Sequence, residues 1–377
     1  MKKRLVLALV LVMLLSLVGC GSGGESGQTG DEPTDSSTVE DGGQQTEDTS
    51  QQDTSFSPDD AEGITAAEMR EQFGAIPLPT EPLVIGGVAK AFENEFWRTL
   101  KEGYEEFGQK LNDQGIDITI DVRSASSEED EEGQLSIVYD MINKGYDGLM
   151  LSPISDSCLT PGVEDAMKEN IPVLSVNDGI IPNAEHFVLP FGKEPGQMAA
   201  DYLGEKLGGE GKVAIVMGMP KAYAARQRTA GFEETIAEKF PNIEIAEKQN
   251  ADWDRALAKD LAETWINKHD DLDAIFCNND TMALGVIEAV KESGRDIMVI
   301  GVDGTSEAYE KIRAGELTAT VDSFPRYMAQ FAFEALLRIQ AGQQLPTVIR
   351  TPEVLIDATN CDMDPAELIN WTEPVFE

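Results

Sequence analysis

The sequence predicts an α/β fold with two parallel sheets, and two observations lead to this prediction. From Leu83 onward, short runs rich in β-branched residues alternate with stretches in which apolar residues recur at helical spacing. Such regular alternation favours parallel sheets covered by helices on both faces. The strand candidates number about nine, and since most sheets have about four to six strands, we expect two sheets. The length of 377 residues also fits two domains with some chain left over.

The predicted strands are short and apolar. They cover residues 83–88, 116–122, 148–151, 173–176, 213–217, 243–246, 274–277, 298–302 and 317–321. The first predicted helix places five apolar side chains on one buried face, namely Phe96, Leu100, Tyr104, Phe107 and Leu111. The same spacing predicts further helices at 129–143, 194–207, 224–239, 255–268, 281–292 and 326–341.

Residues 1–19 have the pattern of a secretory signal peptide. A basic start, Met1 to Arg4, precedes an apolar run of about 13 residues, which is too short to cross a hydrocarbon core of about 30 Å. The run ends in Leu-Val-Gly-Cys, which resembles the lipobox of bacterial lipoproteins and implies cleavage before Cys20 and acylation of its thiol. A plain signal peptide whose cleavage site happens to contain a cysteine is the alternative. We expect a lipid-anchored protein at the outer face of the cell membrane, in a periplasm or on a Gram-positive surface.

Residues 20–80 are predicted to form a flexible acidic tether behind the anchor. Up to about Asp60 the segment consists mainly of Gly, Ser, Thr, Gln, Asp and Glu, so it cannot bury enough apolar surface to offset the entropy of ordering. A short helix near residues 64–73 is the one element expected here. Pro77, Pro79 and Pro82 then lead into the folded part.

Charge and residue spacing exclude several classes of function. The net charge of −40 argues against nucleic acid, whose phosphates need clustered Lys and Arg. The remaining cysteines match no metal motif and allow at most one disulfide; they are Cys158, Cys277 and Cys361. We interpret His186 and His269 as core or surface residues. No nucleophile–base pair, metal set or phosphate loop appears, so we expect neither an enzyme nor a cofactor.

Polar and aromatic side chains follow the carboxyl ends of the predicted strands, which is where ligands bind in open parallel sheets. The candidates are Lys90, Asn94, Phe96, Trp97, Asn177, Asp178, an arginine of the segment 226–228, Trp253, Asn279, Asp280 and Asp303. Carboxylates accept charge-assisted bonds from hydroxyls, amides donate and accept, and an arginine fork spans two vicinal oxygens. Aromatic faces cover the C–H faces of a sugar ring. The set suits a neutral polyhydroxylated ligand.

Several candidates have a structural alternative. Asp280 heads a predicted helix, so it either caps that helix or contacts the ligand. Phe96 and Trp97 are adjacent and cannot share one helix face, so either one fits the core as well as the site. Trp253 taken alone fits the core equally well. The acidic run 128–132 is interpreted as a solvated face.

From about residue 81 to 360 the chain resembles the ribose-type, class I periplasmic sugar-binding proteins of ABC importers. The resemblance rests on six stretches in the order of that family: 94–97 (NEFW), 171–178 (IPVLSVND), 224–228 (AARQR), 251–255 (ADWDR), 277–285 (CNNDTMALG) and 299–305 (VIGVDGT). It implies two Rossmann-like lobes with parallel sheets, joined by a three-strand hinge, with a sugar held in the cleft between them. On this pattern, residues 81–190 and 323–350 form the N-terminal lobe, and 191–322 and 351–377 form the C-terminal lobe.

The resemblance also implies a role for each candidate. From the first lobe, Asn94 bonds sugar hydroxyls, and Phe96 and Trp97 stack on the ring. Further hydrogen bonds come from Asn177 and Asp178. The residues expected to close from the second lobe are Arg226, Trp253, Asn279 and Asp303. Arg226 is preferred to Arg228 on the resemblance alone, because Arg228 also fits a surface or hinge salt bridge.

Three departures from the ribose-type pattern argue against ribose itself. Lys90 falls where arabinose-type members place a sugar-contacting lysine. The pair Asn177-Asp178 stands where ribose binders have Asp-Arg, and Ser323 stands near the third crossover, where they offer glutamine. Another pentose, a hexose, a deoxy sugar or a polyol is an equal expectation.

We therefore expect an extracytoplasmic protein, monomeric and without cofactor, that binds a monosaccharide or related polyol and delivers it to the permease of an ABC importer. A binding protein that presents a sugar or a furanose-like autoinducer to a membrane receptor is the alternative. The transcription repressors that share this fold need a basic DNA-binding motif at the N-terminus, where this chain has a signal peptide and an acidic tether.

Overall fold

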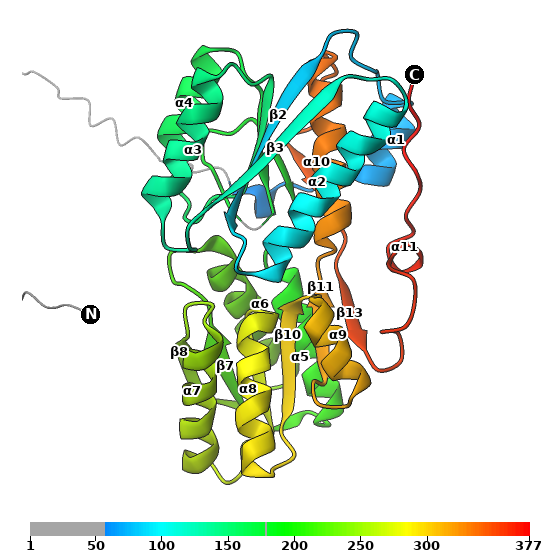
Figure 1. The fold of residues 1–377 in the computed structure, drawn as a ribbon. Coiled ribbons are helices and arrows are strands. Elements are labelled where there is room, and N and C mark those ends of the chain that lie inside the picture. Colours follow the sequence, from blue (N-terminus) through cyan, green and yellow to red (C-terminus); the bar gives the residue numbers. More distant parts are fainter. Residues whose placement is uncertain (1–56, 178) are drawn as a thin grey trace, which may run out of the picture. The chain divides into compact units, whose positions relative to one another are not determined.

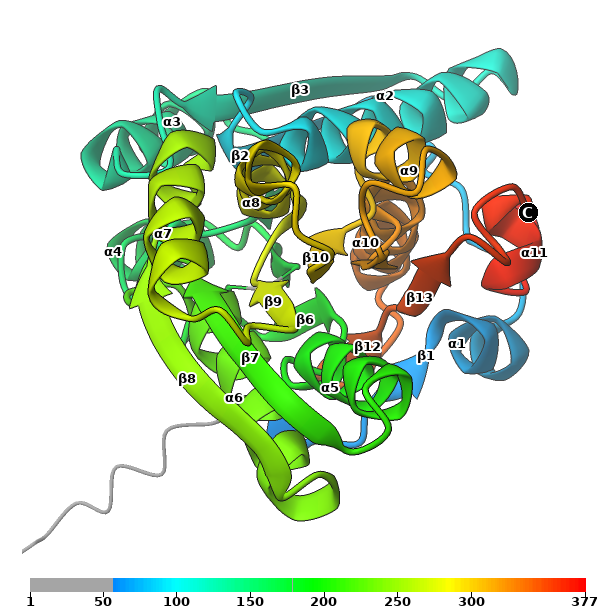
Figure 2. The same ribbon diagram turned by 90° about the horizontal axis from the view of Figure 1, so that it is seen from below.

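The computed structural model describes residues 57–177 and 179–377 (Figure 1). The predicted signal peptide, Cys20, most of the predicted tether and the candidate Asp178 therefore lie outside the described residues. Within the described part, two sheets each carry helices on both faces, and the predicted α/β class is confirmed (Figures 1 and 2).

The first lobe is built on a seven-stranded sheet in the order β1-β12-β6-β5-β4-β2-β3. Every neighbouring pair in it is parallel. Its strands are β1 (Ile64–Thr65), β2 (Leu83–Ala91), β3 (Ile118–Ala125), β4 (Gly148–Leu151), β5 (Val173–Val176), β6 (His186–Leu189) and β12 (Val348–Arg350). Its helices are η1 (Pro58–Asp60), α1 (Ala66–Phe73), α2 (Glu95–Asp113), α3 (Glu131–Asn143), α4 (Thr160–Lys168) and α10 (Pro325–Gln340).

The second lobe is built on a six-stranded sheet in the order β13-β11-β10-β9-β7-β8. Its strands are β7 (Glu210–Met217), β8 (Asn242–Asn250), β9 (Ala274–Cys277), β10 (Met298–Asp303), β11 (Ala319–Asp322) and β13 (Val354–Asp357), with β13 antiparallel to β11. In Figure 2, α7 (Arg255–Lys268), α8 (Asp280–Ser293) and α9 (Ser306–Arg313) cover one face. The other face carries α5 (Glu194–Lys206) and α6 (Tyr223–Lys239).

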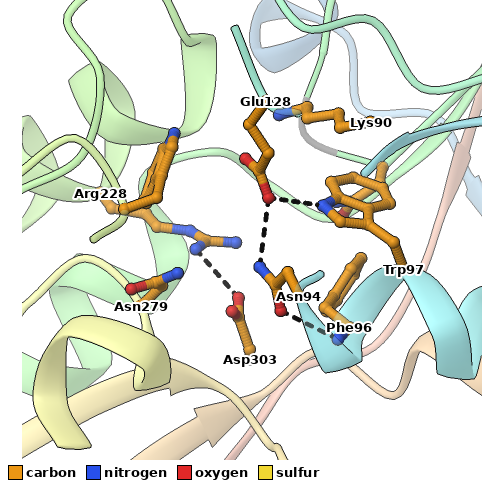
Figure 3. Close-up of a pocket in the computed structure, with 10 residues that line it drawn as sticks. Lys90, Asn94, Phe96, Trp97, Glu128, Arg228, Asn279 and Asp303 are labelled. Carbon is orange, nitrogen blue, oxygen red and sulfur yellow. Dashed lines mark hydrogen bonds and ion pairs between the residues drawn. The ribbon is translucent and has the colours of Figure 1, made fainter. Parts of the chain in front are cut away.

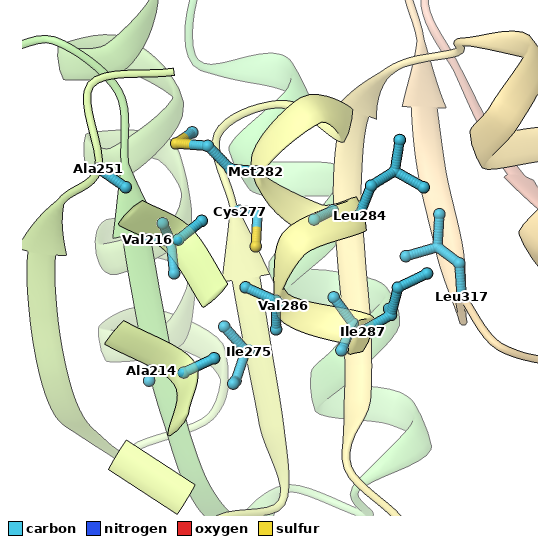
Figure 4. Packing of buried hydrophobic residues seen from close by; sticks show 14 of the residues in the cluster. Ala214, Val216, Ala251, Ile275, Cys277, Met282, Leu284, Val286, Ile287 and Leu317 are labelled. Carbon is cyan, nitrogen blue, oxygen red and sulfur yellow. The ribbon is translucent and has the colours of Figure 1, made fainter. Parts of the chain in front are cut away.

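Each sheet separates two apolar clusters, as expected of a parallel sheet buried on both faces. In the first lobe, the predicted face of α2 is buried, with Leu100, Tyr104 and Phe107 at most 1% exposed. In the second lobe, Ile275 and Cys277 of β9 pack against Val286 of α8 (Figure 4). The cysteines Cys158, Cys277 and Cys361 are free thiols.

Three crossovers join the lobes, as the resemblance implied. The chain passes between them at 190–193, after β6, at 323–324, before α10, and at 351–353, between β12 and β13. These short connections lie side by side in the structure because β12 pairs with β6 and β13 pairs with β11. They form the hinge.

The structure departs from the prediction at both ends of the folded region. Residues 57–80, assigned to the tether, are folded against the first lobe, where β1 pairs with β12 and Met69 is fully buried. Residues at the C-terminus, assigned to the second lobe, return to the first lobe after α11 (Pro365–Leu368). There Trp371 and Phe376 pack against its core, and Ile76 pairs with Phe376. Strands of two to four residues, paired with distant parts of the chain, leave no periodic pattern by which to predict them.

Within the described residues, no helix has the length and apolar character needed to span a membrane.

Candidate ligand-binding site

A cavity lies between the lobes, at the carboxyl ends of strands from both sheets. Its lining residues are Lys90, Asn94, Phe96, Trp97, Glu128, Asn177, Arg228, Trp253, Asn279 and Asp303 (Figure 3). The cavity volume is about 20 Å³. Since a single water needs roughly 10–15 Å³ by the same measure, a sugar ring enters only when side chains move or the lobes separate.

The first lobe presents two aromatic rings and an amide at the start of α2. Asn94 is the N-cap of this helix, and its Oδ1 accepts a hydrogen bond from the Phe96 amide at 3.0 Å. The side-chain Nδ2 is thereby turned toward the cavity (Figure 3). Phe96 and Trp97 meet edge to face, with centroids 4.9 Å apart. Both are buried at 3% exposure and both line the cavity, so neither belongs to the core alone.

Lys90 is buried near the carboxyl end of β2, just before the loop that leads to α2. It lies in β2, where it is 2% exposed, and its Nζ is 5.2 Å from the centroid of the Trp97 ring. A cation at this distance from an indole face is attracted by the ring's quadrupole. Lys90 therefore holds a buried charge at the cavity wall beside the stacking surface.

Glu128 lines the cavity and was not among the predicted site residues. Its Oε1 accepts hydrogen bonds from Trp97 Nε1 at 2.9 Å and from Asn94 Nδ2 at 3.3 Å. The interpretation of this residue as part of a solvated face was wrong, because the loop after β3 turns its side chain inward toward α2 (Figure 3). The position just after a strand end was the available signal, and the neighbouring acidic residues obscured it.

Asn177 follows β5 and adopts a left-handed backbone with φ of +69°. The residue is 1% exposed, and its Oδ1 has no hydrogen-bond partner among the described residues. Such strain and a buried acceptor left unpaired both carry an energetic cost, and they are commonest at binding sites. Asp178, predicted beside it, lies outside the described residues.

In the second lobe the cavity is lined by Arg228, not by the predicted Arg226. Arg228 Nη1 donates to the Asn278 carbonyl at 2.7 Å and lies 3.2 Å from Asp303 Oδ1. Arg226 instead donates to the Pro220 carbonyl and forms an ion pair with Asp156 of the first lobe, and its side chain is 42% exposed. Arg226 and Arg228 are two residues apart on α6, so their side chains point about 200° apart around the helix axis. Only one of them can therefore face the cavity.

Asn279 and Asp303 complete the polar wall of the second lobe. Asn279 is the N-cap of α8, and its Oδ1 accepts from the Met282 amide at 2.9 Å. Asp303 ends β10 with a φ of +129° and is 5% exposed. Asp280 is neither the cap nor a lining residue. Its buried carboxylate accepts from Thr305 and Thr320, and burial raises its pKa to about 6.

Trp253 is held rigidly by its loop and by a glycine. Asp252 and Trp253 are consecutive left-handed residues, with φ of +51° and +68°. The indole packs against Gly218, where an added Cβ would lie 2.2 Å from the ring. Trp253 both lines the cavity and joins the apolar cluster of the second lobe, so the two alternatives for this residue are not exclusive.

The charges of the described lining residues balance. Lys90 and Arg228 are cationic, and Glu128 and Asp303 are anionic. Two indole rings and amide groups from both lobes surround them. Such a wall offers both donors and acceptors without a net charge, which favours a neutral polar ligand with a C–H face.

Two parallel-sheet lobes around one polar, aromatic-lined cavity define a hinged ligand-binding protein. Comparison with known proteins identifies the family. Residues 85–344 match the model of the periplasmic binding protein domain, and the chain belongs to this family.

Named relatives agree with this assignment. The ribose import binding protein RbsB of Bacillus subtilis (strain 168) is 34% identical over 269 residues, which cover 71% of this chain and 85% of the relative. The D-allose-binding periplasmic protein of Escherichia coli (strain K12) is 31% identical and covers 72% of this chain and 89% of its own length. A periplasmic solute-binding protein of an ABC transporter from Actinobacillus succinogenes 130z, solved with bound D-allose, superposes with a TM-score of 0.69. It shares 26% identity and covers 74% of this chain and 99% of its own.

Proposed function

We propose that this protein binds a neutral monosaccharide or related polyol between its two lobes and delivers it to the permease of an ABC importer. The observation that supports this most strongly is the cavity wall itself. It combines two indole rings with amide, carboxylate and guanidinium groups, and both lobes supply them. Two relatives are named as binding proteins for ribose and for D-allose, and both sugars belong to the proposed ligand class.

Binding would couple to closure of the lobes. A sugar contacts both Asn94 of the first lobe and Asn279 of the second only when the lobes are closed, so the ligand favours the closed state. A few hydrogen bonds to charged groups, at about 1.5–3 kcal/mol each, together with stacking, are enough for micromolar binding or better after the costs of association.

The proposed ligand is not restricted to ribose. Ser323, at the hinge position where ribose-type proteins offer glutamine, does not line the cavity, and its Oγ donates to Glu353 Oε1 at 2.7 Å. Lys90 adds a cation close to Trp97. We therefore include hexoses, deoxy sugars and polyols as candidates.

We also propose that the protein acts outside the cytoplasm as a monomer held by a lipid on Cys20. The signal-like start and the Leu-Val-Gly-Cys sequence support the anchor. The periplasmic solute-binding relatives support the location.

A thermal-shift screen tests the binding function. A ligand that binds only the folded state raises the melting temperature, by an amount that grows with the logarithm of its concentration divided by its Kd. The purified protein is screened with neutral pentoses, hexoses, deoxy sugars and polyols, and with sugar acids as charged comparators. We expect a shift with at least one neutral compound and none with its acid. A larger shift with sugar acids, or none with any neutral compound, would contradict the proposal.

A further inference from the structure

We propose that Glu128 determines ligand size in this site. Its carboxylate forms part of the wall between the binding cavity and a larger outer cavity. It accepts a hydrogen bond from one ligand hydroxyl and excludes sugars in which that hydroxyl carries a substituent. This inference rests on the proposed function and concerns the same site.

Two cavities adjoin in the cleft. The inner one is the cavity described above, of about 20 Å³, and the outer one measures about 430 Å³. Three residues line both: Asn94 and Glu128 from the first lobe, and Trp253 from the second. These three side chains therefore form the partition between the cavities, and it is complete only when both lobes contribute.

Glu128 is the adjustable member of the partition. Asn94 is fixed by its capping bond to the Phe96 amide, and Trp253 by its packing against Gly218. Glu128 lies in the loop between β3 and α3, and its carboxylate is positioned by Trp97 Nε1 at 2.9 Å and Asn94 Nδ2 at 3.3 Å. Replacement of this side chain leaves the cap residue and the core residues themselves unchanged, although it removes the acceptor of Trp97 Nε1 and Asn94 Nδ2.

The chemistry of a carboxylate explains the selectivity. When ionised it only accepts hydrogen bonds, so a sugar hydroxyl can donate to it, whereas an ether or glycosidic oxygen has no proton to give. A substituent on that oxygen removes the proton that the ligand would donate, and it would also occupy space beside the carboxylate, so the substituted sugar loses a charge-assisted hydrogen bond and meets a steric clash. Both effects reject the substituted sugar more strongly than the loss of one contact would.

The outer cavity is large enough to hold the hydroxyl substituent that Glu128 is proposed to exclude. About 430 Å³ falls within the range of small-molecule sites. Its lining includes the carboxylates of Glu129 and Asp252, the hydroxyl of Thr281 and the apolar side chains of Met219 and Leu257. A short substituent that passed the partition would meet polar and apolar groups there. Removal of the Glu128 side chain should join the cavities.

Calorimetric titration tests this inference. The probes are D-ribose, D-allose and any sugar found in the thermal-shift screen, each with its methyl glycosides and mono-O-methyl ethers. The variants are Glu128→Ala, which removes the wall, and Glu128→Gln, which keeps its size. Glu132→Ala is the matched control, since Glu132 is an exposed acid of α3 that lines neither cavity.

We expect the wild type to bind a free sugar and to reject at least one methylated derivative of it by about 100-fold or more. Glu128→Ala should weaken binding of the free sugar about tenfold and reduce that rejection at least tenfold. Glu128→Gln keeps the size of the side chain but adds an amide donor that can bond an ether oxygen, so it should keep only the steric part of the rejection, and Glu132→Ala should match the wild type. An unchanged ratio between free and methylated sugar in Glu128→Ala would overturn the inference, even if all affinities fell, because a positioning role alone would lower both. If the wild type bound no sugar at all, the proposed function would fail as well.

Discussion

Arg228 and Asp303 form a buried ion pair in the second lobe, with Nη1 of the guanidinium 3.2 Å from Oδ1 of the carboxylate. Their side chains are 5% and 6% exposed, and Arg228 also donates to the Asn278 carbonyl. The pair joins α6 to the end of β10 and holds both charged groups at the cavity wall. The partners orient each other, so a ligand meets groups that are already in place.

Replacement of this arginine should abolish most sugar binding. Arg228→Ala removes the guanidinium proposed to contact the ligand and breaks the buried ion pair with Asp303, and breaking a buried pair typically costs about 3–5 kcal/mol. We expect an affinity loss of at least about 100-fold and a lower melting temperature. The comparison is Arg226→Ala, which breaks an exposed pair with Asp156 and should change affinity by no more than about fivefold. Equal losses in the two variants, measured by calorimetry, would show that Arg228 has no special role.

Gly218 should be essential for the position of Trp253. In Gly218→Ala the new Cβ would lie 2.2 Å from the indole, so the ring must move into the cavity or away from it. We expect affinity to fall at least tenfold, with a smaller effect on stability. Trp253→Phe keeps a ring that can fit beside the added methyl, so the double variant should regain part of the loss. Full affinity in Gly218→Ala would contradict the role given to Trp253.

The sequence predicted the architecture well because its main strands are buried on both faces. The runs 148–151, 173–176 and 274–277 coincide with β4, β5 and β9. The missed strands β1, β6, β12 and β13 are short and depend on partners far along the chain. The hinge and the return of the C-terminus to the first lobe follow from those pairings, so local patterns could not predict them.

For the site, the positions of the strand ends predicted several lining residues, whereas the sequence did not show which of two neighbouring side chains points into the cavity. Asn94, Asn177 and Asn279 follow strands, Asp303 ends one, and all four line the cavity. Arg228 and Glu128 were misjudged because helix phase and loop path decide which neighbour faces inward. A shift of one or two positions changes that outcome, and spacing alone does not determine it.

A buried acid at the hinge should make stability depend on pH. Burial raises the pKa of Glu353 from an ordinary value of 4.5 to about 8, with Arg228 opposing and Asp322 adding to the shift. The folded state therefore keeps this proton where the unfolded state has lost it. The resulting stability is complete below about pH 4.5 and is lost as pH rises toward 8.

Glu353→Gln tests that dependence, because an amide cannot ionise and can still accept from Ser323. Relative to the wild type, its free energy of unfolding should rise by about 1–3 kcal/mol between pH 5 and pH 8.5. Urea unfolding at the two pH values measures this. Asp322, whose pKa is raised to about 7 by burial, is present in both proteins, so the effect of its own burial is common to the two measurements. A difference that did not change with pH would contradict the assigned pKa.

The C-terminal return should stabilise the first lobe without forming the site. The Trp371 ring centroid lies 4.8 Å from that of Tyr327 and 5.1 Å from that of Phe331, and Arg70 stacks on the indole at 4.8 Å. Trp371→Ala should reduce the free energy of unfolding by about 2–4 kcal/mol, with sugar affinity unchanged within about threefold. Chemical unfolding and calorimetry measure the two effects. Unaltered stability would mean that the segment is held by other contacts.

The central claim is that groups from both lobes bind one neutral sugar in the cleft. Isothermal titration calorimetry of the purified protein with neutral pentoses, hexoses, deoxy sugars and polyols tests it most directly. We predict that at least one of them binds with 1:1 stoichiometry and a Kd of about 1 μM or lower, and that Asn94→Ala and Arg228→Ala, one from each lobe, each abolish most of that heat. Absence of binding across the whole panel, or full binding in either variant, would contradict the claim.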